Sequence, residues 1–377
     1  MSKIKILFDI EYVYHLAAMD PVIDVFAHDD RYNCAINYGI EPYRRFGFWK
    51  IPSMDMFLPH LKVDRLRRAE PGEKFDAVFV GDTKRNAEQF GKTMLCFVNH
   101  GTGIKTVIYR NLRRHSHTKY MIFVEGEYRY GALQESGALG LSQVHKIGLP
   151  KIDPYFREGT FDREEILLRY GLDPDKKTVL YAPTFKPTSI YRLENHIFTE
   201  TRDYNLIIKL HHYSWMGKYA PHRQHRIFER RVGKYPHAAL VPVQHYNILP
   251  LMAASDTLIS EASSTIFDYL ALGKFGVIYD LDHERLKHSD GEPIMALDNR
   301  RLFDGAFVHI DQPNKISKAV AQAVNPTTEM KAKGDEYRNF FFHQLDGNAA
   351  QRLKVKFEEL LADEGNQNNP VAPQPLG

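Results

Sequence analysis

The sequence predicts an α/β protein built from two doubly wound domains that face each other across a cleft. Short apolar runs alternate with helical patterns along most of the chain, which is typical of parallel sheets whose strands are joined by helices. The length of 377 residues exceeds the usual size of one domain, and an apolar content of 43% is enough for two cores. Ligands of such domains bind where strands end, so polar residues at strand ends are the functional candidates.

The first half begins with a buried strand at 3–10, followed by a helix from Tyr12 and a return strand at Val22–Ala27. Further apolar runs predict strands at 75–80, 94–98, 120–124 and 144–147.

His100 follows the predicted strand at 94–98, and Gly101 and Thr102 come directly after it. A glycine at this point lets a substrate approach the backbone closely. An imidazole can take a proton from an attacking hydroxyl near neutral pH, so His100 is the candidate general base. The alternative is a strand-end histidine that only hydrogen-bonds to a loop. Gly101 and Thr102 form the candidate loop on the acceptor side.

A connection rich in proline, glycine and charge at 153–162 predicts the boundary between the two domains. The division places the first domain at 1–158 and the second at 159–334. A crossing helix at 335–363 is expected to return to the first domain, and a polar, proline-rich flexible tail covers 364–377.

The second half continues the alternation of strands and helices. Strands are expected at 178–182, 204–210, 238–242, 257–259, 277–279 and 307–310, and the last helix at 349–362. Two of these strands end in polar groups. Thr184 and Lys186 follow the first of them, and His211 follows the second, where as an imidazolium it would bind a phosphate oxygen.

The stretch around Ser263, Ser264 and Thr265 predicts an anion cradle. It joins a strand to an apolar helix, so hydroxyls and free backbone N–H groups meet at a helix start, where the helix dipole favours a phosphate. The alternative is that the three residues merely cap a buried helix. Glu261 and Asp268 stand about two helical turns apart, so both are expected to face the ligand and to hold ribose or base hydroxyls.

Composition excludes several classes of protein. A net charge of +3 is not the balance of a nucleic-acid-binding protein. Cys34 and Cys96 lie far apart in apolar surroundings, which suits reduced, buried thiols in a cytoplasmic protein. Asp9 and Glu11 interrupt the apolar N-terminus, so neither a signal peptide nor a membrane span is expected there. No histidine, cysteine and carboxylate spacing indicates a structural zinc, and no metal site is predicted.

Two basic runs offer a surface for anionic lipid headgroups at the inner face of the cell membrane or for a phosphorylated acceptor. One is the run 218–234, and the other consists of Arg110, Arg113, Arg114, His115, His117 and Lys119. A solvated helix face is the alternative.

Five motifs occur in a characteristic order. They are His100-Gly101-Thr102, Tyr181-Ala182-Pro183-Thr184-Phe185, Lys209-Leu210-His211, the run from Ile259 through Ser263-Ser264 to Phe267-Asp268, and Asp346-Gly347-Asn348. Their order resembles the CDP-glycerol glycerophosphotransferase family of wall teichoic acid and capsule polymer synthesis. The resemblance covers most of the chain from about His100 to Arg352, and the first hundred residues match only in general character.

The resemblance implies a GT-B fold, with a Rossmann-like acceptor domain, a Rossmann-like nucleotide-donor domain and the active site between them, and no cofactor or obligatory metal. By position, His100 resembles the family's catalytic base and His211 its phosphate-contacting histidine. Ser263, Ser264 and Thr265 resemble the cradle of the donor pyrophosphate.

This chain departs from the family pattern at several positions. The family usually has Asp-Tyr where this chain has Glu261-Ala262, proline where it has His212, arginine where it has Lys186, and proline where it has Gly103. Lys186 keeps the charge of arginine but loses the bidentate fork. The departures bear on the identity of the donor.

The expected function is transfer of a phosphoglycerol or related phosphopolyol group from a CDP-activated donor to a hydroxyl of a glycan or lipid-linked acceptor, with release of CMP. The alternatives are a GT-B glycosyltransferase that uses a nucleotide sugar, a nucleotide-sugar epimerase, and a catalytically silent binding module in a polymer-synthesis complex.

Overall fold

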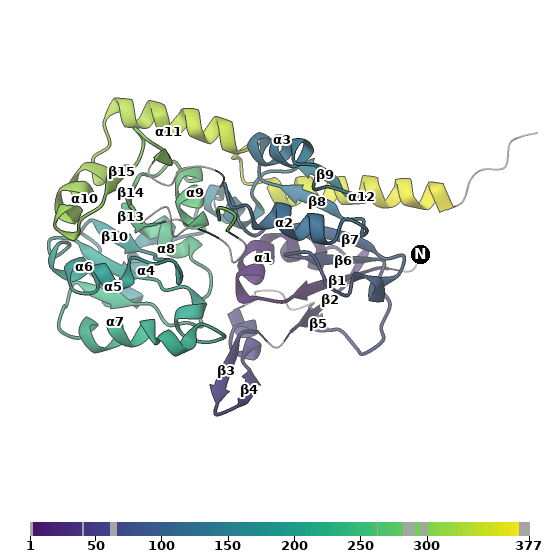
Figure 1. Ribbon diagram of the computed structural model, residues 1–377, viewed down its shortest axis with the longest axis horizontal. Helices are drawn as coiled ribbons and strands as arrows, with labels where there is room; N and C mark the ends of the chain where they lie inside the picture. The colour runs from purple at the N-terminus through teal and green to yellow at the C-terminus, as the bar shows by residue number, and fades with distance from the viewer. Residues whose placement is uncertain are drawn as a thin grey trace, which may run out of the picture.

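The computed structural model describes residues 3–39, 41–60, 66–261, 263–281, 287, 291–294, 296 and 301–368. Two parallel sheets form two halves of the molecule, which lie side by side (Figure 1). A small antiparallel hairpin of β3 (Tyr43–Phe46) and β4 (Trp49–Pro52) projects from the body at the lower edge of this view.

The first sheet has seven strands, and all its described pairings are parallel. In spatial order they are β5 (Arg67–Arg68), β2 (Tyr32–Tyr38), β1 (Ile4–Ile10), β6 (Ala77–Val80), β7 (Met94–Val98), β8 (Met121–Val124) and β9 (Gln143–Lys146). The strand order reverses between β1 and β6, so the carboxyl ends of these strands are the expected place for a ligand.

The second sheet has six strands, again all parallel. In spatial order they are β12 (Ala238–Leu240), β11 (Asn205–Ile208), β10 (Thr178–Tyr181), β13 (Thr257–Ser260), β14 (Gly276–Tyr279) and β15 (Val308–Ile310). Its order reverses between β10 and β13, which precede the Thr184 loop and the Ser263 turn. Two doubly wound sheets, as predicted, therefore carry the polar strand ends.

Helices cover both sheets (Figure 1). They are α1 (Val13–Ala27), α2 (Val107–Arg114), α3 (Glu127–Glu135), α4 (Arg163–Arg169), α5 (Ile190–Leu193), α6 (His196–Thr199), α7 (Gln224–Val232), α8 (Leu249–Ala254), α9 (Ser264–Ala271), α10 (Ile316–Val324), α11 (Thr328–Phe341) and α12 (Ala349–Asn368). Short 3-10 helices lie in the connections at η1 (Met54–Met56), η2 (Leu58–His60), η3 (Ala87–Phe90), η4 (Pro150–Phe156), η5 (His212–Ser214), η6 (Ala220–His222) and η9 (Pro313–Lys315).

Each sheet is buried on both faces because alternate side chains of its strands enter different cores. On β1, Ile6 and Phe8 join one apolar cluster and Leu7 joins another. On β10, Val179 and Leu180 divide in the same way. This burial explains why the strands read as continuous apolar runs in the sequence.

The chain returns to its first half through α11 and α12 (Figure 1). Helix α11 contacts α9 and α3, and α12 packs on α1 and η4. The first turn of α12 is capped from outside, since the Asp153 carboxylate accepts the N–H groups of Ala349 and Ala350 at 3.1 and 2.7 Å. A buried carboxylate on two free N–H groups of a helix start fixes where the crossing helix begins.

Three predictions about elements are wrong. The single crossing helix predicted at 335–363 is two helices, because α11 ends at Phe341 and α12 begins at Ala349. Val22–Ala27 is not a return strand but the second half of α1, and the return strand is β2. The helix is buried between the sheet and α12, so its apolar run gives no period that distinguishes helix from strand. The tail at 364–377 was placed too early, because α12 runs to Asn368; residues 369–377 lie outside the described residues.

The predicted domain boundary at 158/159 lies between η4 and α4, and it stays a prediction.

Replacing Asp153 with alanine is expected to lower the free energy of unfolding by about 1–3 kcal/mol, because two buried N–H groups lose their acceptor. Chemical denaturation measures this loss. Asp153→Asn, which keeps one acceptor oxygen, should lose less.

The same pair of variants carries a pH test. Burial raises the pKa of Asp153 from 3.8 to about 6, so the folded state binds a proton more tightly than the unfolded state. Compared with Asp153→Asn, the native protein should therefore lose stability as the pH rises from about 4 to about 6. If the native protein instead gained stability relative to Asp153→Asn as the pH rose over this range, this account of the cap would be contradicted.

Candidate active site

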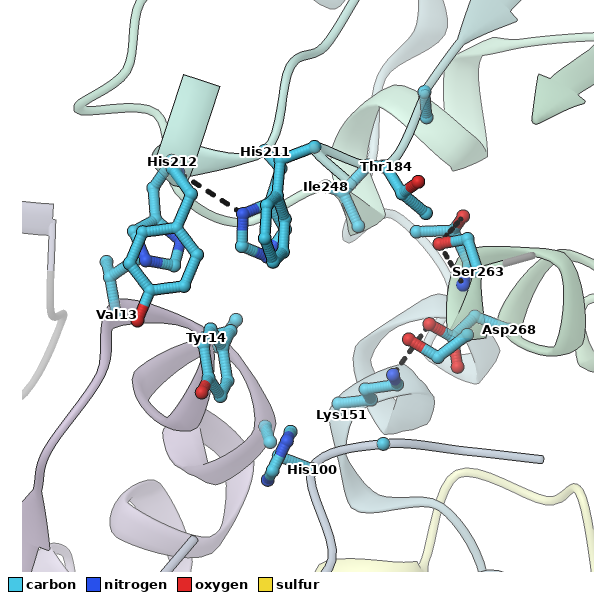
Figure 2. Close-up of a pocket in the computed structure, with 18 of the residues that line it drawn as sticks. Val13, Tyr14, His100, Lys151, Thr184, His211, His212, Ile248, Ser263 and Asp268 are labelled. Carbon is cyan, nitrogen blue, oxygen red and sulfur yellow. Dashed lines mark hydrogen bonds and ion pairs between the residues drawn. The ribbon is translucent and has the colours of Figure 1, made fainter. Parts of the chain in front are cut away.

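A cavity of about 410 Å³ lies between the two sheets, and its walls come from the carboxyl ends of their strands (Figure 2). The first half contributes the start of α1, the loop after β7 and η4. The second half contributes the loops after β10 and β11 and the start of α9. The predicted residues that line the cavity are His100, Gly101, Thr184, Lys186, His211, Ser263, Ser264, Thr265 and Asp268.

His100 is held in one tautomer by a backbone group. Its Nδ1 lies 2.5 Å from the carbonyl oxygen of Gly81, which can only accept, so Nδ1 carries the proton. The other ring nitrogen, Nε2, is then left with its lone pair. Burial lowers the pKa of His100 below 6.5, although the nearby Asp82 carboxylate and the Gly81 carbonyl oppose this shift. The neutral ring is the form that accepts a proton.

His211 is held in the opposite tautomer. Its Nδ1 accepts the backbone N–H of Tyr213 at 3.2 Å, so in the neutral ring the proton is on Nε2. Burial and the neighbouring His212, Lys105 and Lys209 lower its pKa well below 6.5. The expected imidazolium is therefore wrong for the free protein. A neutral Nε2–H remains a hydrogen-bond donor for a phosphate oxygen.

Tyr14, near the start of α1, lies between the two histidines (Figure 2). Its ring centroid is 4.7 Å from that of His100 and 6.0 Å from that of His211. Burial raises its pKa well above 10, so the phenol keeps its proton. His212, which follows His211 in the chain, is buried against Tyr14 and Tyr213. Burial lowers the pKa of its imidazole to about 3.

The start of α9 forms the predicted turn. Ser263 is the N-cap residue, and its Oγ accepts from the backbone N–H and the hydroxyl of Thr265 at 3.3 and 2.8 Å. Ser263, Ser264 and Thr265 are half-buried and line the cavity. These residues therefore cap a buried helix and also place the first turn of that helix at the cavity. The helix cap and the anion cradle, which were given as alternatives, are compatible.

Four lysines border the cavity. Lys105, Lys151 and Lys209 are partly or fully buried, while Lys186 is exposed at the rim. Burial lowers the pKa of Lys209 to about 8, and burial together with Lys151 lowers that of Lys105. Cations that are desolvated beside a cavity favour an anionic ligand there.

The two carboxylates that were predicted to hold ribose or base hydroxyls, Glu261 and Asp268, are both engaged by protein groups. Glu261 is fully buried and accepts from the backbone N–H groups of Thr184 and Ser189 and from the Ser189 hydroxyl. It fixes the loop 184–189 and does not line the cavity. Asp268 does line it, but its oxygens are engaged by the Thr102 hydroxyl at 2.8 Å and Lys151 Nζ at 2.6 Å.

The helix start explains these corrections. The predicted alignment of Glu261 with Asp268 requires a helix that includes position 261, whereas α9 begins at Ser264. Thr102, expected on the acceptor side, is buried and belongs to the Asp268 contact. The hydroxyl of Thr184 donates to the Pro187 carbonyl, so this residue shapes its loop.

The structure explains why this chain has Gly103 where the family pattern usually has proline. Its φ is +99°, which proline cannot adopt, and its N–H donates to Glu125 at 3.0 Å. A Cβ there would lie 2.4 Å from the Phe267 ring. Ala262, another departure, lies outside the described residues.

The model of one protein family matches residues 88–357 of the chain. It is described as CDP-Glycerol:Poly(glycerophosphate) glycerophosphotransferase. The chain belongs to this family.

Curated relatives agree with this family. The teichoic acid glycerol-phosphate primase of Bacillus subtilis (strain 168) is 26% identical over 270 residues, which cover 68% of this chain and 62% of the primase. The teichoic acid poly(ribitol-phosphate) polymerase of Bacillus spizizenii is 24% identical over 253 residues, 63% of this chain and 37% of the polymerase. The chain thus spans less than two thirds of the length of either relative.

Solved structures share the fold. A variant of the wall teichoic acid polymerase TagF superposes with a TM-score of 0.66 at 14% identity, covering 96% of this chain and 90% of that chain. A UDP-N-acetylglucosamine 2-epimerase homologue of Listeria monocytogenes gives 0.60 at 13% identity, covering 96% and 98%. The predicted GT-B fold is confirmed.

For the residues that the structure describes, no group of three or more histidine, cysteine or carboxylate side chains is placed to hold a metal ion. None of their helices is long and apolar enough to cross a membrane.

The sequence reasoning missed Tyr14, Lys105 and Lys151, all of which line the cavity of this family member. Tyr14 lies outside the range that the family model matches. Its signal was available, since it follows the first strand at the point where the strand order reverses. The two lysines sit in connections without a pattern, so only the fold brings them to the cavity.

Glu261→Gln is expected to lower the free energy of unfolding by about 1–3 kcal/mol, because a neutral amide oxygen is a weaker acceptor for the two backbone N–H groups and the NH2 replaces the oxygen that accepts the Ser189 hydroxyl. Thermal or chemical unfolding measures the change. Glu164→Gln, which is exposed on α4, is the matched control and should stay within about 0.5 kcal/mol. Equal stability of both variants would show that Glu261 does not hold the 184–189 loop.

Proposed function

We propose that the chain transfers a phosphoglycerol or related phosphopolyol group from a CDP-activated donor to a hydroxyl of a glycan or lipid-linked acceptor, and releases CMP. The observation that carries the proposal is the pair of opposite histidine tautomers, His100 as acceptor and His211 as donor, on the two sides of one cavity. The family and the names of the relatives support the donor class. One TagF structure of the same fold was soaked with CDPG.

The first step of the proposed reaction is removal of the acceptor proton. Nε2 of His100 takes the proton of the acceptor hydroxyl, and the oxygen attacks the β-phosphorus of the donor. A new P–O bond forms as the bond between this phosphorus and the bridging oxygen breaks, and the electron pair leaves with CMP. A base positioned in this way contributes about 10²–10⁴-fold to the rate.

The second half of the molecule is proposed to stabilise the phosphates. Nε2–H of His211 donates to an oxygen of the transferring group, and the first turn of α9 at Ser263–Thr265 holds the pyrophosphate. Lys186 and Lys105 add positive charge at the rim and inside the cavity. Positioning and electrostatics supply most of the rate in phosphoryl transfer.

The proposed reaction needs no cofactor and no obligatory metal. We place the enzyme in the cytoplasm, with peripheral contact to the inner face of the cell membrane and no nucleic-acid partner. The role of the product in cell-surface polymer synthesis, teichoic acid or capsule, follows from the names of the relatives and is part of the proposal.

His100→Asn tests the base. Asparagine can keep a donor near the position of Nδ1, and therefore the bond to Gly81, but it has no group at the position of Nε2. Acceptor-dependent release of CMP from CDP-glycerol is expected to fall about 10²–10⁴-fold, with donor affinity nearly unchanged. Turnover equal to the native enzyme would remove His100 from the mechanism.

His211 is tested by a matched pair. Glutamine places an NH2 group near Nε2, whereas asparagine reaches only the position of Nδ1. Turnover by His211→Gln should exceed that of His211→Asn, and the latter should lose about 10²–10³-fold. If the two variants lose the same activity, a directional hydrogen bond from this position is not required.

The dependence of CMP release on pH gives an independent check of the base. Because the pKa of His100 is lowered, the ring stays neutral at pH 7, and activity should fall only as the pH drops below about 6.5. The residual activity of His100→Asn should lack this acid limb. A limb centred above neutral pH would assign the base to another group.

A panel of donors separates the proposal from its alternatives. Turnover with CDP-glycerol or CDP-ribitol supports it. Turnover with a nucleotide sugar and an acceptor would indicate a glycosyltransferase, and conversion of a nucleotide sugar without an acceptor would indicate an epimerase. Binding without any turnover would leave a silent binding module.

A further inference from the structure

The hairpin formed by β3 (Tyr43–Phe46) and β4 (Trp49–Pro52) projects from the body of the molecule (Figure 1). Its turn consists of Gly47 and Phe48. Large apolar side chains are exposed on it to an unusual extent: Phe46 76%, Phe48 105%, Trp49 76% and Ile51 52%. Contiguous exposed apolar side chains mark an interaction surface.

The register of the hairpin separates two kinds of side chain. Phe46 pairs with Trp49 and Arg44 with Ile51, so these four side chains share one face. Arg45 pairs with Lys50 on the other face. Both cations of that face lie over the ring of Tyr43, at 6.0 and 4.9 Å from its centroid. One face therefore carries Phe46, Trp49 and Ile51 with Arg44 at the end remote from the turn, and the opposite face is cationic.

Apart from the ring of Tyr43, the cationic face has no compensating group within the hairpin. Like charges that lie directly opposite each other destabilise a strand pair, and Arg45 and Lys50 are such a pair. The segment 43–52 contains no carboxylate, and among the described residues neither cation forms an ion pair. An anionic partner would remove this repulsion.

The root of the hairpin is fixed beside the cavity. Tyr43 is buried, and its carbonyl accepts the N–H of Gly217 at 2.8 Å. Gly217 belongs to the loop that begins at His211, and a Cβ added at Gly217 would lie 3.0 Å from the ring of Tyr213, a cavity residue. The hairpin is thus a rigidly rooted projection near the mouth of the site.

We propose that this hairpin docks the protein on an anionic phospholipid bilayer. Phe46, Phe48 and Trp49 enter the headgroup region, and the cations contact lipid phosphates. Tryptophan and phenylalanine beside arginine and lysine are the side chains that suit this boundary. Strands of four residues reach about 10–14 Å, which matches the depth of about 5–10 Å that interfacial elements occupy.

The proposal differs from the expectation that the basic runs bind lipid. In those runs the aromatic side chains are not exposed, since Phe228 is buried and Tyr219 is half-buried, whereas the hairpin exposes aromatic groups beside its charges. The hairpin also lies outside residues 88–357, the range of the family model, so it does not follow from the family. It does not depend on the proposed reaction.

The full chain should first be sedimented with vesicles of phosphatidylcholine and phosphatidylglycerol in equal amounts, and with vesicles of phosphatidylcholine alone. Binding is expected only to the anionic vesicles and should weaken with salt. Trp49 should also show a blue shift and quenching by brominated lipid. The second tryptophan, Trp215, is stacked on His225 within the body and should change little.

Three double variants locate the contact. Phe48→Ser with Trp49→Ser should lose binding about tenfold or more. Arg45→Gln with Lys50→Gln should weaken binding to anionic vesicles about 10- to 30-fold. Arg113→Gln with Arg114→Gln removes the same charge from the end of α2 and should bind like the native chain.

The proposal would be overturned if the Phe48→Ser, Trp49→Ser variant (the tip variant) bound vesicles like the native chain, or if only the Arg113→Gln, Arg114→Gln variant lost binding. A dimer that depends on the tip and forms without vesicles would also overturn it, because the hairpin would then contact a second copy. CMP release with a soluble acceptor should be unchanged in the tip variant. Since none of the hairpin substitutions lies in the cavity, a failure of the reaction and a failure of lipid binding can be told apart.

Discussion

The geometry of the cleft depends on one buried contact, the Asp268 carboxylate. It lies on α9 of the second half and accepts from Thr102 and Lys151 of the first half. Burial raises its pKa, and the Lys151 cation opposes that shift. Breaking a buried pair of this kind costs about 3–5 kcal/mol, because the remaining charge stays desolvated. The contact therefore holds the His100 loop at a fixed place opposite the start of α9.

With the two halves held together in this way, the backbone sets the tautomers of the two histidines. The carbonyl of Gly81 and the N–H of Tyr213 cannot exchange their roles as acceptor and donor, so the tautomers of His100 and His211 cannot exchange either. Burial then keeps both rings neutral. The proposed phosphate site therefore needs no charged histidine, because the lysines that line the cavity supply the positive charge.

The sequence predicted the sheets and the polar strand ends because both follow from local patterns. An apolar run marks a strand, and the residue after it must lie at the edge of the sheet. The roles of Glu261 and Asp268 could not be predicted in this way. Whether a carboxylate faces a ligand or a neighbouring loop depends on where the helix begins and on what the other half presents. Lys151, which forms an ion pair with Asp268, is distant from it in sequence and belongs to no motif.

The hairpin and the cavity share a structural element, and this links the two proposals without making either depend on the other. The loop from His211 to Gly217 begins with the histidine that is proposed to contact phosphate, and at its other end Gly217 donates its N–H to the carbonyl of Tyr43. The two ends cannot move independently, because Tyr213 packs between them against Phe185 and Tyr219. A bilayer that holds the hairpin would therefore also set the distance from the cavity to the lipid surface. An acceptor hydroxyl carried on a lipid would then be presented at a fixed height, which reduces the entropy lost when the hydroxyl is aligned with His100.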